Sequence, residues 1–257
     1  RGWCEATFPA DFVGREGGRR GGWFSQLHVS ATALFDKPPV KACIAHGIVL
    51  GSDGRKLSKR LRNYPDPLEA FNRYGSDAVR WAQLSSAVLR GGNQIATEAA
   101  MEDSLRAAVL PLWHACRSLT MYAEAAPTPN LAPVADLDRY LLAKAHDRVA
   151  GVQAAMDAFD LSGAASRIEG FLDACNNWWI RRSRDRLWSG DQAAIDTLYT
   201  ALELMLRVAA PLLPMTADHL WTTPPGGSSV PLADWPTADA LPAHPPLLPH
   251  PPPLPHL

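Results

Sequence analysis

The sequence predicts a mainly α protein with a short α/β segment on its N-terminal side. Apolar residues recur every three or four positions from Leu137 to Phe159, from Ile168 to Trp179 and from Ile195 to Ala209, which is typical of amphipathic helices. Three such helices with short joints favour an antiparallel bundle. The apolar, β-branched run from Val40 to Leu50 is typical of a buried strand in an α/β sheet.

Composition limits the functions that the chain can have. Its 257 residues suffice for one large or two smaller domains, and a net charge of −1 means that any contact with nucleic acid must come from local basic patches. The four cysteines form no C-x-x-C pair and the histidines are dispersed, so we expect no protein-bound metal. Scattered reduced thiols suit a cytoplasmic protein, and the lack of a long apolar run predicts no membrane association.

The first half of the chain alternates helices with loops. The glycine- and arginine-rich residues 1–22 predict a flexible loop, and the apolar spacing of Trp23, Leu27, Ala31 and Leu34 predicts a helix. A second helix begins at the Asp66-Pro67 cap and ends at Gly75. A third continues through Trp81, and Thr97 caps a longer one that reaches Leu119.

Proline marks two later segments. Residues 126–133 hold three prolines and predict a connector, after which the three bundle helices follow and a last short helix begins near Thr216. From Pro236 onward nine of 22 residues are proline, so we expect an extended or disordered tail there. Arg1 at the start suggests a fragment, and a frameshift near residue 242 is one hypothesis for the abrupt change of composition.

A compact basic loop, Lys56-Leu57-Ser58-Lys59-Arg60, follows the strand and a Ser52-Asp53-Gly54 turn. Flexible ammonium groups three residues apart can hold a polyphosphate, although short basic loops are more often plain solvated surface. His46, at the end of the strand, can face a nucleotide or serve as a structural histidine. The common glycine-rich phosphate-binding motifs are absent from the sequence.

The run from His46 to Arg60, the Asn63-Tyr64-Pro65-Asp66-Pro67 segment and Tyr74 to Arg80 form one ordered series. It resembles class I aminoacyl-tRNA synthetases, the isoleucine-specific members in particular, with Leu57 in place of a methionine. The resemblance implies that Lys56 and Lys59 are catalytic and stabilise charge on the phosphates of ATP. It also implies that Ser58, His46 and Gly47 complete an ATP site, with Mg²⁺ entering on the nucleotide.

A second motif, Asn177-Trp178-Trp179-Ile180-Arg181-Arg182-Ser183-Arg184, is similar to a run in the anticodon-binding helical domain of that family. The resemblance implies that Arg181, Arg182, Arg184 and Trp179 contact the tRNA for isoleucine. Guanidinium groups beside indole rings also fit RNA on chemical grounds. The plainer alternative is that Trp178 and Trp179 pack inside the bundle while the arginines pair with Asp173 and Asp185.

The same resemblance implies a division of the chain. Residues 1–62 would be the C-terminal remnant of a Rossmann-type α/β catalytic domain, 63–126 a helical stem-contact region, 134–223 an antiparallel anticodon-binding bundle, and 224–257 the proline-rich tail. The implied reaction is ATP-dependent activation of isoleucine and its transfer to tRNA. The family's HIGH motif is absent and Arg19 replaces an expected glutamine, so we expect no catalysis by this chain alone.

The synthetase interpretation treats the chain as a fragment that is inactive without the rest of the enzyme. Two alternatives to it stay open. The chain can be a catalytically inactive helical module that binds tRNA or a protein partner, or a structural fragment without a ligand. A separate N-terminal half is a conceivable partner under the synthetase interpretation. Activity in pyrophosphate exchange, and retention of tRNA, separate these cases.

Overall fold

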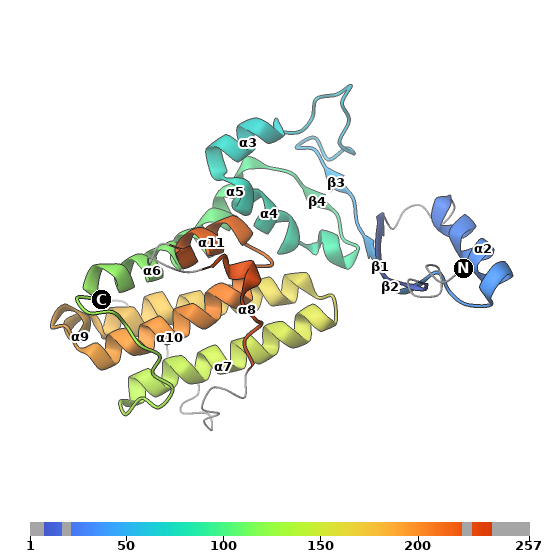
Figure 1. Ribbon diagram of the computed structural model, residues 1–257. Coiled ribbons are helices and arrows are strands. Elements are labelled where there is room, and N and C mark those ends of the chain that lie inside the picture. Colours follow the sequence, from blue (N-terminus) through green and yellow to red (C-terminus); the bar gives the residue numbers. More distant parts are fainter. Residues whose placement is uncertain (1–7, 17–21, 223–227, 238–257) are drawn as a thin grey trace.

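The computed structural model describes residues 8–16, 22–222 and 228–237. Within these ranges the protein is mostly helical, with a small βαβ unit at one end and a helical bundle at the other (Figure 1). Arg19, Cys4 and the proline-rich tail from residue 238 lie outside the described residues. The predicted fold class, mainly α with a small α/β part, is confirmed.

The N-terminal unit consists of β1 (Ala10–Glu16), α2 (Trp23–Phe35) and β2 (Val40–His46). The two strands are parallel, with Ala10 opposite Val40 and Glu16 opposite His46. The prediction of a flexible loop throughout residues 1–22 is therefore wrong for residues 10–16. Pairing with β2 stabilises this stretch, although its charged residues and glycine weaken the strand pattern.

The single strand predicted from Val40 to Leu50 is divided in two. After β2 the chain turns at Gly47 into β3 (Val49–Leu50), which pairs in parallel with β4 (Gln94–Ile95). A Cβ atom on Gly47 would lie 1.7 Å from the carbonyl oxygen of Gly92, so only glycine allows this close approach. Side chains of β2 alternate between half-buried and exposed, so the prediction of a fully buried strand is also wrong.

The helix predicted from Trp23 is confirmed as α2, but most of its apolar side chains lie at the surface. Ala31 is its one buried residue, whereas Trp23 is 61% exposed and Leu34 is 75% exposed. The spacing therefore gave the helix correctly. It did not give the burial of its apolar face.

Both predicted caps of the next region are present. The Asp66 carboxylate accepts hydrogen bonds from the amides of Leu68 and Glu69, and α3 (Pro67–Tyr74) starts there. Gly75 separates α3 from α4 (Ser76–Leu84) and has a φ of 82°, which favours glycine. The short 3₁₀ turn η1 (Ala87–Arg90) then leads to β4.

The long helix predicted from Thr97 contains a π-helical stretch. Thr97 caps α5 (Glu98–Ser104), η2 (Leu105–Val109) is the π segment, and α6 (Leu110–Tyr122) completes the run. Pro111 has no amide hydrogen and its ring disfavours the regular α-helical pattern in the preceding turn. A π segment directly before this proline is a way to accommodate it.

The three predicted bundle helices are confirmed. They are α7 (Asp136–Asp157), α8 (Leu161–Asp173), extended by the π segment η3 (Ala174–Ile180), and α10 (Gln192–Ala209). They run in alternating directions (Figure 1). The short α9 (Arg184–Trp188) precedes α10, and η4 (Val230–Leu232) follows α11 (Pro214–Thr222), which begins two residues before the predicted Thr216.

One hydrophobic core joins the bundle to α6. It includes Leu112 of α6 together with Leu141, Phe171 and Leu202 of the three bundle helices, all at most 1% exposed. The proline-containing connector lies along α10, where the amide of Asn130 donates to the Thr200 hydroxyl at 2.8 Å. Trp81 of α4 also belongs to this core and donates its indole N–H to Glu169 at 2.8 Å.

The cysteines are unpaired where they are described. Cys116 and Cys175 are buried and Cys43 is exposed. Burial raises the pKa of Cys116 to about 12, so its thiol stays protonated. In the described ranges, none of the helices combines the length and the apolar character that crossing a bilayer requires.

Candidate functional site

The basic loop predicted to hold ATP is an ordered hairpin at its base. We call residues 51–63 the lysine loop. Leu50 bridges Lys56 in antiparallel fashion, and the Gly51 amide donates to the Arg55 carbonyl at 2.8 Å. Gly54 closes the turn with a φ of 72°. The loop therefore leaves β3 in a defined direction.

Asn63 holds the two arms of the lysine loop together. Its carbonyl oxygen accepts the Ser58 amide at 3.0 Å, and its amide group donates to Asp53 at 2.9 Å. A Cβ atom on Gly51 would lie 2.2 Å from the backbone oxygen of Asn63, so the close packing of the arms requires glycine. Sequence analysis did not select Asn63, although it lies in the Asn-Tyr-Pro-Asp-Pro segment that carried the family resemblance.

Asp53 has a structural task in the same loop. The hydrogen bond from Asn63, together with one from the Arg55 amide, lowers the pKa of Asp53. An ionised carboxylate with these partners stabilises the turn. Its hydrogen bonds with Asn63 and the Arg55 amide therefore hold the loop in shape.

The predicted catalytic lysines are at the surface of the loop. Lys56 and Lys59 are exposed, and Ser58 between them is half-buried. The backbone oxygen of Ser58 accepts the amides of Leu61 and Arg62, at 3.1 and 2.9 Å, which turns the chain directly after the lysines. Exposed ammonium groups on a pinned turn can approach polyphosphate oxygens without a change in the hairpin base.

His46 and Gly47, the other predicted ATP contacts, lie at the carboxyl end of β2. Ligands of open α/β sheets bind outside this end of the strands. The Nδ1 atom of His46 lies 2.9 Å from the Gly47 carbonyl oxygen, and because a carbonyl only accepts, Nδ1 carries the proton. This hydrogen bond supports the interpretation of His46 as a structural histidine. The Nε2 atom of His46 takes no part in it and can bind another group.

The structure corrects the prediction that Trp179 contacts RNA. Its side chain is 0% exposed, and its indole N–H donates to Asp138 at 3.1 Å. Asp138 also accepts two bonds from Arg186, at 2.9 and 2.8 Å, and Arg186 pairs with Asp191 at 2.8 Å. A ring enclosed in this way cannot stack on a base, so the packing alternative is the correct one for Trp179.

The expected arginine pairs are also different. Asp173 accepts the side-chain amide of Asn177 at 2.7 Å, and the arginine that forms ion pairs is Arg186, with Asp138 and Asp191. The hydrogen bonds that Arg186 donates to the Asp138 carboxylate raise the pKa of Arg186, which stays charged. The three arginines within the motif are exposed: Arg181, Arg182 and Arg184. This motif therefore divides into a buried structural half and an exposed cationic half.

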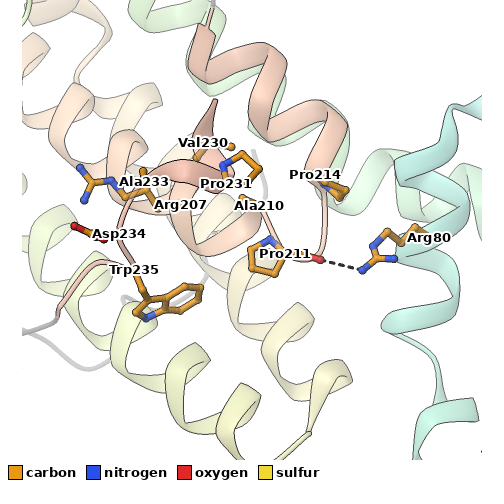
Figure 2. Close-up of a pocket in the computed structure, with 10 residues that line it drawn as sticks. All are labelled: Arg80, Arg207, Ala210, Pro211, Pro214, Val230, Pro231, Ala233, Asp234 and Trp235. Carbon is orange, nitrogen blue, oxygen red and sulfur yellow. Dashed lines mark hydrogen bonds between the residues drawn. The ribbon is translucent and has the colours of Figure 1, made fainter. Parts of the chain in front are cut away.

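A groove of about 490 Å³ lies elsewhere, between α4 and the turn from α10 to α11. Figure 2 shows its proline-rich lining and the guanidinium of Arg80, which donates to the Pro211 carbonyl at 3.0 Å. Asp77 of the same helix accepts the Thr216 amide at 2.6 Å. These bonds join α4 to α11, so we interpret this place as a structural joint.

A second groove, of about 530 Å³, lies where the π segments approach each other. Asn176 of η3 joins α8 to α6 there, since its side-chain amide donates to the carbonyl of Pro111 at 3.1 Å and to that of Leu172 at 2.9 Å. His114 and Arg106 line it together with Glu169. The opposite charges along its walls favour no single class of ligand.

Across residues 8–16, 22–222 and 228–237, no three His, Cys, Asp or Glu side chains are grouped so that they could hold a metal ion.

Two family profiles match the chain. Residues 3–94 match the profile described as class I tRNA synthetases for I, L, M and V, which contains the lysine loop. Residues 138–246 match the anticodon-binding domain of tRNA ligase, which contains the exposed arginines.

Curated relatives extend this similarity to nearly the whole chain. The isoleucine–tRNA ligase of Corynebacterium efficiens is 50% identical over 94% of this chain, and that of Mycobacterium leprae is 49% identical over 95%. That of Mycobacterium tuberculosis is 47% identical over 94%. The chain spans about a quarter of their length, 23% in each case.

A solved structure shares the fold. The ternary complex of LeuRS, tRNA and LeuAMS from Agrobacterium radiobacter superposes with a TM-score of 0.73 over 93% of this chain and 30% of that one. The sequence identity is 20%, so the likeness shows the arrangement of the helices and strands.

Proposed function

Because the chain belongs to the class I aminoacyl-tRNA synthetases, as a segment similar to isoleucine–tRNA ligases, we propose that it serves in the ligation of isoleucine to its tRNA. The observation that carries this proposal is the pinned lysine loop followed by the exposed arginines, in a chain about half identical to these ligases. The complete reaction belongs to the whole enzyme.

In that reaction the isoleucine carboxylate attacks the α-phosphorus of ATP. The bond to the bridging oxygen breaks, pyrophosphate leaves with the electron pair, and isoleucyl adenylate forms. A tRNA terminal hydroxyl then displaces AMP from the acyl carbon. Lys56 and Lys59 would stabilise the negative charge that grows on the phosphate oxygens, and the Asn63 bonds would hold them in position.

The bundle would hold the tRNA for isoleucine. Exposed Arg181 and Arg184 supply charge for phosphate oxygens, and the Asp138–Arg186 pair fixes the helix turn that carries them. This supports an assignment of residues 134–223 as the anticodon-binding part. Residues 63–126 would be the stem-contact part. Residues 1–62 would be the end of the catalytic domain. A cytoplasmic location follows from the same proposal.

We expect no amino acid activation by the 257-residue chain alone. In the described residues the N-terminal unit supplies two parallel strands and one helix for nucleotide binding, and a doubly wound fold binds its ligand at the junction between two halves of a sheet. Residues outside this chain would supply the rest of that site.

The decisive experiment is isoleucine-dependent exchange of pyrophosphate into ATP. In a complete enzyme that contains this segment, Lys59→Ala should reduce the exchange rate by a factor of about 10²–10³, since it removes a charge that acts in the transition state. Arg60→Ala is the matched control, because this exposed neighbour has the same charge. Equal rates for the two variants would contradict the catalytic role of Lys59.

A second candidate function is a tRNA-binding module without catalysis, which the self-contained core of the bundle favours. Retention of tRNA by the 257-residue chain at moderate salt, reduced when Arg181 and Arg182 become alanine, fits both functions. If the complete enzyme keeps its activity when Lys59 is replaced by alanine, the tRNA-binding module is favoured as the function of this segment.

A further inference from the structure

Four side chains on neighbouring helical segments contact one another in series on one face of the bundle. We call this series the stack, although the planes of its Tyr140 and Trp178 rings are inclined by 60°. Tyr140 and Lys144 belong to α7, Trp178 belongs to η3, and Arg182 follows it by four residues. The rings of Tyr140 and Trp178 are 6.3 Å apart, and the Lys144 ammonium lies 5.4 Å from the Tyr140 ring. The Cζ atom of Arg182 lies 3.5 Å from the centre of the Trp178 ring.

The 3.5 Å distance between the Cζ atom of Arg182 and the centre of the Trp178 ring determines the orientation of the guanidinium. An aromatic ring and a planar group in contact are separated by about 3.5 Å, which is the carbon contact distance. If the guanidinium stood on edge, at least one of its nitrogens would be about 0.7–1.3 Å closer to the ring and would overlap with it. The Arg182 group therefore lies flat on Trp178, and its second face points away from the ring.

The two adjacent tryptophans of η3 differ in burial, since Trp178 is half-buried and Trp179 is buried. Trp179 fills the core and is fixed by Asp138, so the adjacent Trp178 falls on the outer side of η3. Residues four apart meet on a helix surface, which brings Arg182 over Trp178. The same spacing places Lys144 beside Tyr140. The stack thus has a rigid base on two helices of the core.

The surroundings of the stack carry charges of both signs, with arginines in excess. Arg181 and Arg184 are exposed beside it on the chain, and the exposed Asp173 carboxylate, which accepts the side-chain amide of Asn177, adds a negative charge near Tyr140. Burial raises the pKa of Tyr140, so its hydroxyl stays protonated and can donate a hydrogen bond.

We propose that the outer face of the Arg182 guanidinium is a stacking platform for one unpaired base of an RNA loop. The base continues the series Tyr140–Trp178–Arg182, while Lys144 and Arg181 lie near the adjacent phosphates. Splayed bases stack on guanidinium planes and aromatic rings in many RNA complexes. A base within a duplex has both faces covered, so the platform favours single-stranded loops. This inference rests on the proposed tRNA-binding function and deepens it.

The test distinguishes the contribution of the planar guanidinium of Arg182 to RNA binding from the contribution of its positive charge. The complete 257-residue chain is titrated with a short RNA hairpin that carries 2-aminopurine in its loop, and with a fully paired RNA of equal length. Arg182→Lys retains the charge and removes the plane. Because base stacking contributes about 1–3 kcal/mol, hairpin affinity should fall by a factor of about 5–150, with duplex affinity unchanged.

Two further variants complete the design. Trp178→Leu removes the support of the guanidinium and should also reduce hairpin affinity and the change in 2-aminopurine fluorescence. Arg117→Lys, an exposed arginine on α6, is the matched control and should bind both RNAs as the unaltered chain does. Far-ultraviolet circular dichroism checks that each variant is folded.

The outcomes distinguish this inference from the proposed function. Full hairpin affinity in Arg182→Lys or in Trp178→Leu, or an equal loss for hairpin and duplex, overturns the stacking platform. If tRNA binding nevertheless persists, the proposed function stands without it. Absence of all RNA binding by the unaltered chain overturns the platform and the tRNA-binding role together, while pyrophosphate exchange by a complete enzyme still tests catalysis.

Discussion

Helices α2 and α10 have similar apolar spacing and very different surroundings. In α10, 12 of 18 residues are buried, and they extend around most of the helix. In the 13 residues of α2, Ala31 alone is buried, and large side chains such as Trp23 and Leu34 are exposed. Apolar periodicity therefore predicts that a helix forms. Whether its apolar face is covered depends on the elements packed against it.

The two ends of the chain differ in the same way. The bundle encloses its own core from α6, α7, α8 and α10, so its stability depends on contacts within the chain. The N-terminal unit has a pair of parallel strands and one loosely covered helix in the described residues. Parallel sheets in α/β proteins are usually covered on both faces. We therefore expect substitutions in the bundle to change global stability and equivalent ones in α2 to have little effect.

The largest difference should come from one pair of leucines. Leu202 of α10 is 1% exposed and Leu34 of α2 is 75% exposed. Leu202→Ala should lower the free energy of unfolding by about 3–4 kcal/mol, because it removes buried methyl groups and leaves a cavity. Leu34→Ala should change it by less than about 0.5 kcal/mol. Urea denaturation followed by circular dichroism at 222 nm, a wavelength that reports helix, measures both.

The chemical change is identical at the two positions, so each variant is the control of the other. Equal losses of stability would mean that α2 is covered as well as α10 is. The comparison between the two ends of the molecule would then be wrong.

A second pair of variants compares buried and exposed ion pairs. Asp138 is 1% exposed, and Arg186 supplies two of its hydrogen bonds. Arg186→Met should destabilise the bundle by roughly 3 kcal/mol, since it leaves a buried carboxylate without its counter-charge. Arg73→Met breaks the exposed pair with Glu98 and should cost at most about 1 kcal/mol.

Salt distinguishes the two pairs further. Adding salt should reduce the small effect of Arg73→Met, because exposed charges are screened, and should leave the effect of Arg186→Met nearly unchanged. A strong dependence on salt for Arg186→Met would show that Asp138 is reached by solvent ions.

The sequence predicted the helices and their caps well because these depend on local residues. Asp66 and Thr97 cap the helices that they were expected to cap. The apolar series Ile168, Leu172, Cys175 and Trp179 had already placed Trp179 on the core side, in conflict with its use as an RNA contact. For Trp179, the apolar periodicity therefore predicted the burial of the side chain correctly, whereas the resemblance to the family did not.

The remaining features depend on contacts between distant residues. β1 is a strand because β2 pairs with it, and its own residues, with a glycine and three charges, do not show it. The π-helical form of η3 is not visible in the apolar spacing of three and four residues, which also fits a regular α-helix. Asn63 binds residues up to ten positions away, so its role required the folded loop.

The smallest expected effect concerns the cap of α10 and depends on pH. The Asp191 carboxylate accepts the amides of Ala193 and Ala194 and pairs with Arg186. Burial by itself would raise the pKa of Asp191, but the bonds from Arg186 and the two amides outweigh it and lower the pKa below its ordinary value of 3.8. A carboxyl group whose pKa is lower in the folded state stabilises the fold above its unfolded pKa. That stability is lost as pH falls through the folded pKa.

Asp191→Asn keeps an oxygen at the cap and removes the charge, so it should cost about 1 kcal/mol at neutral pH. The difference from the unaltered chain should shrink below pH 3.8 and disappear once Asp191 is protonated in the folded protein. Unfolding midpoints in urea over this pH range measure it, with Asp185→Asn on the exposed side of α9 as the control. If the loss of stability in Asp191→Asn stays constant through the acid range, the shape of the cap and not its charge stabilises the helix. A loss that follows the predicted curve assigns it to the charge, and thus to Arg186, which joins this cap to the buried Asp138.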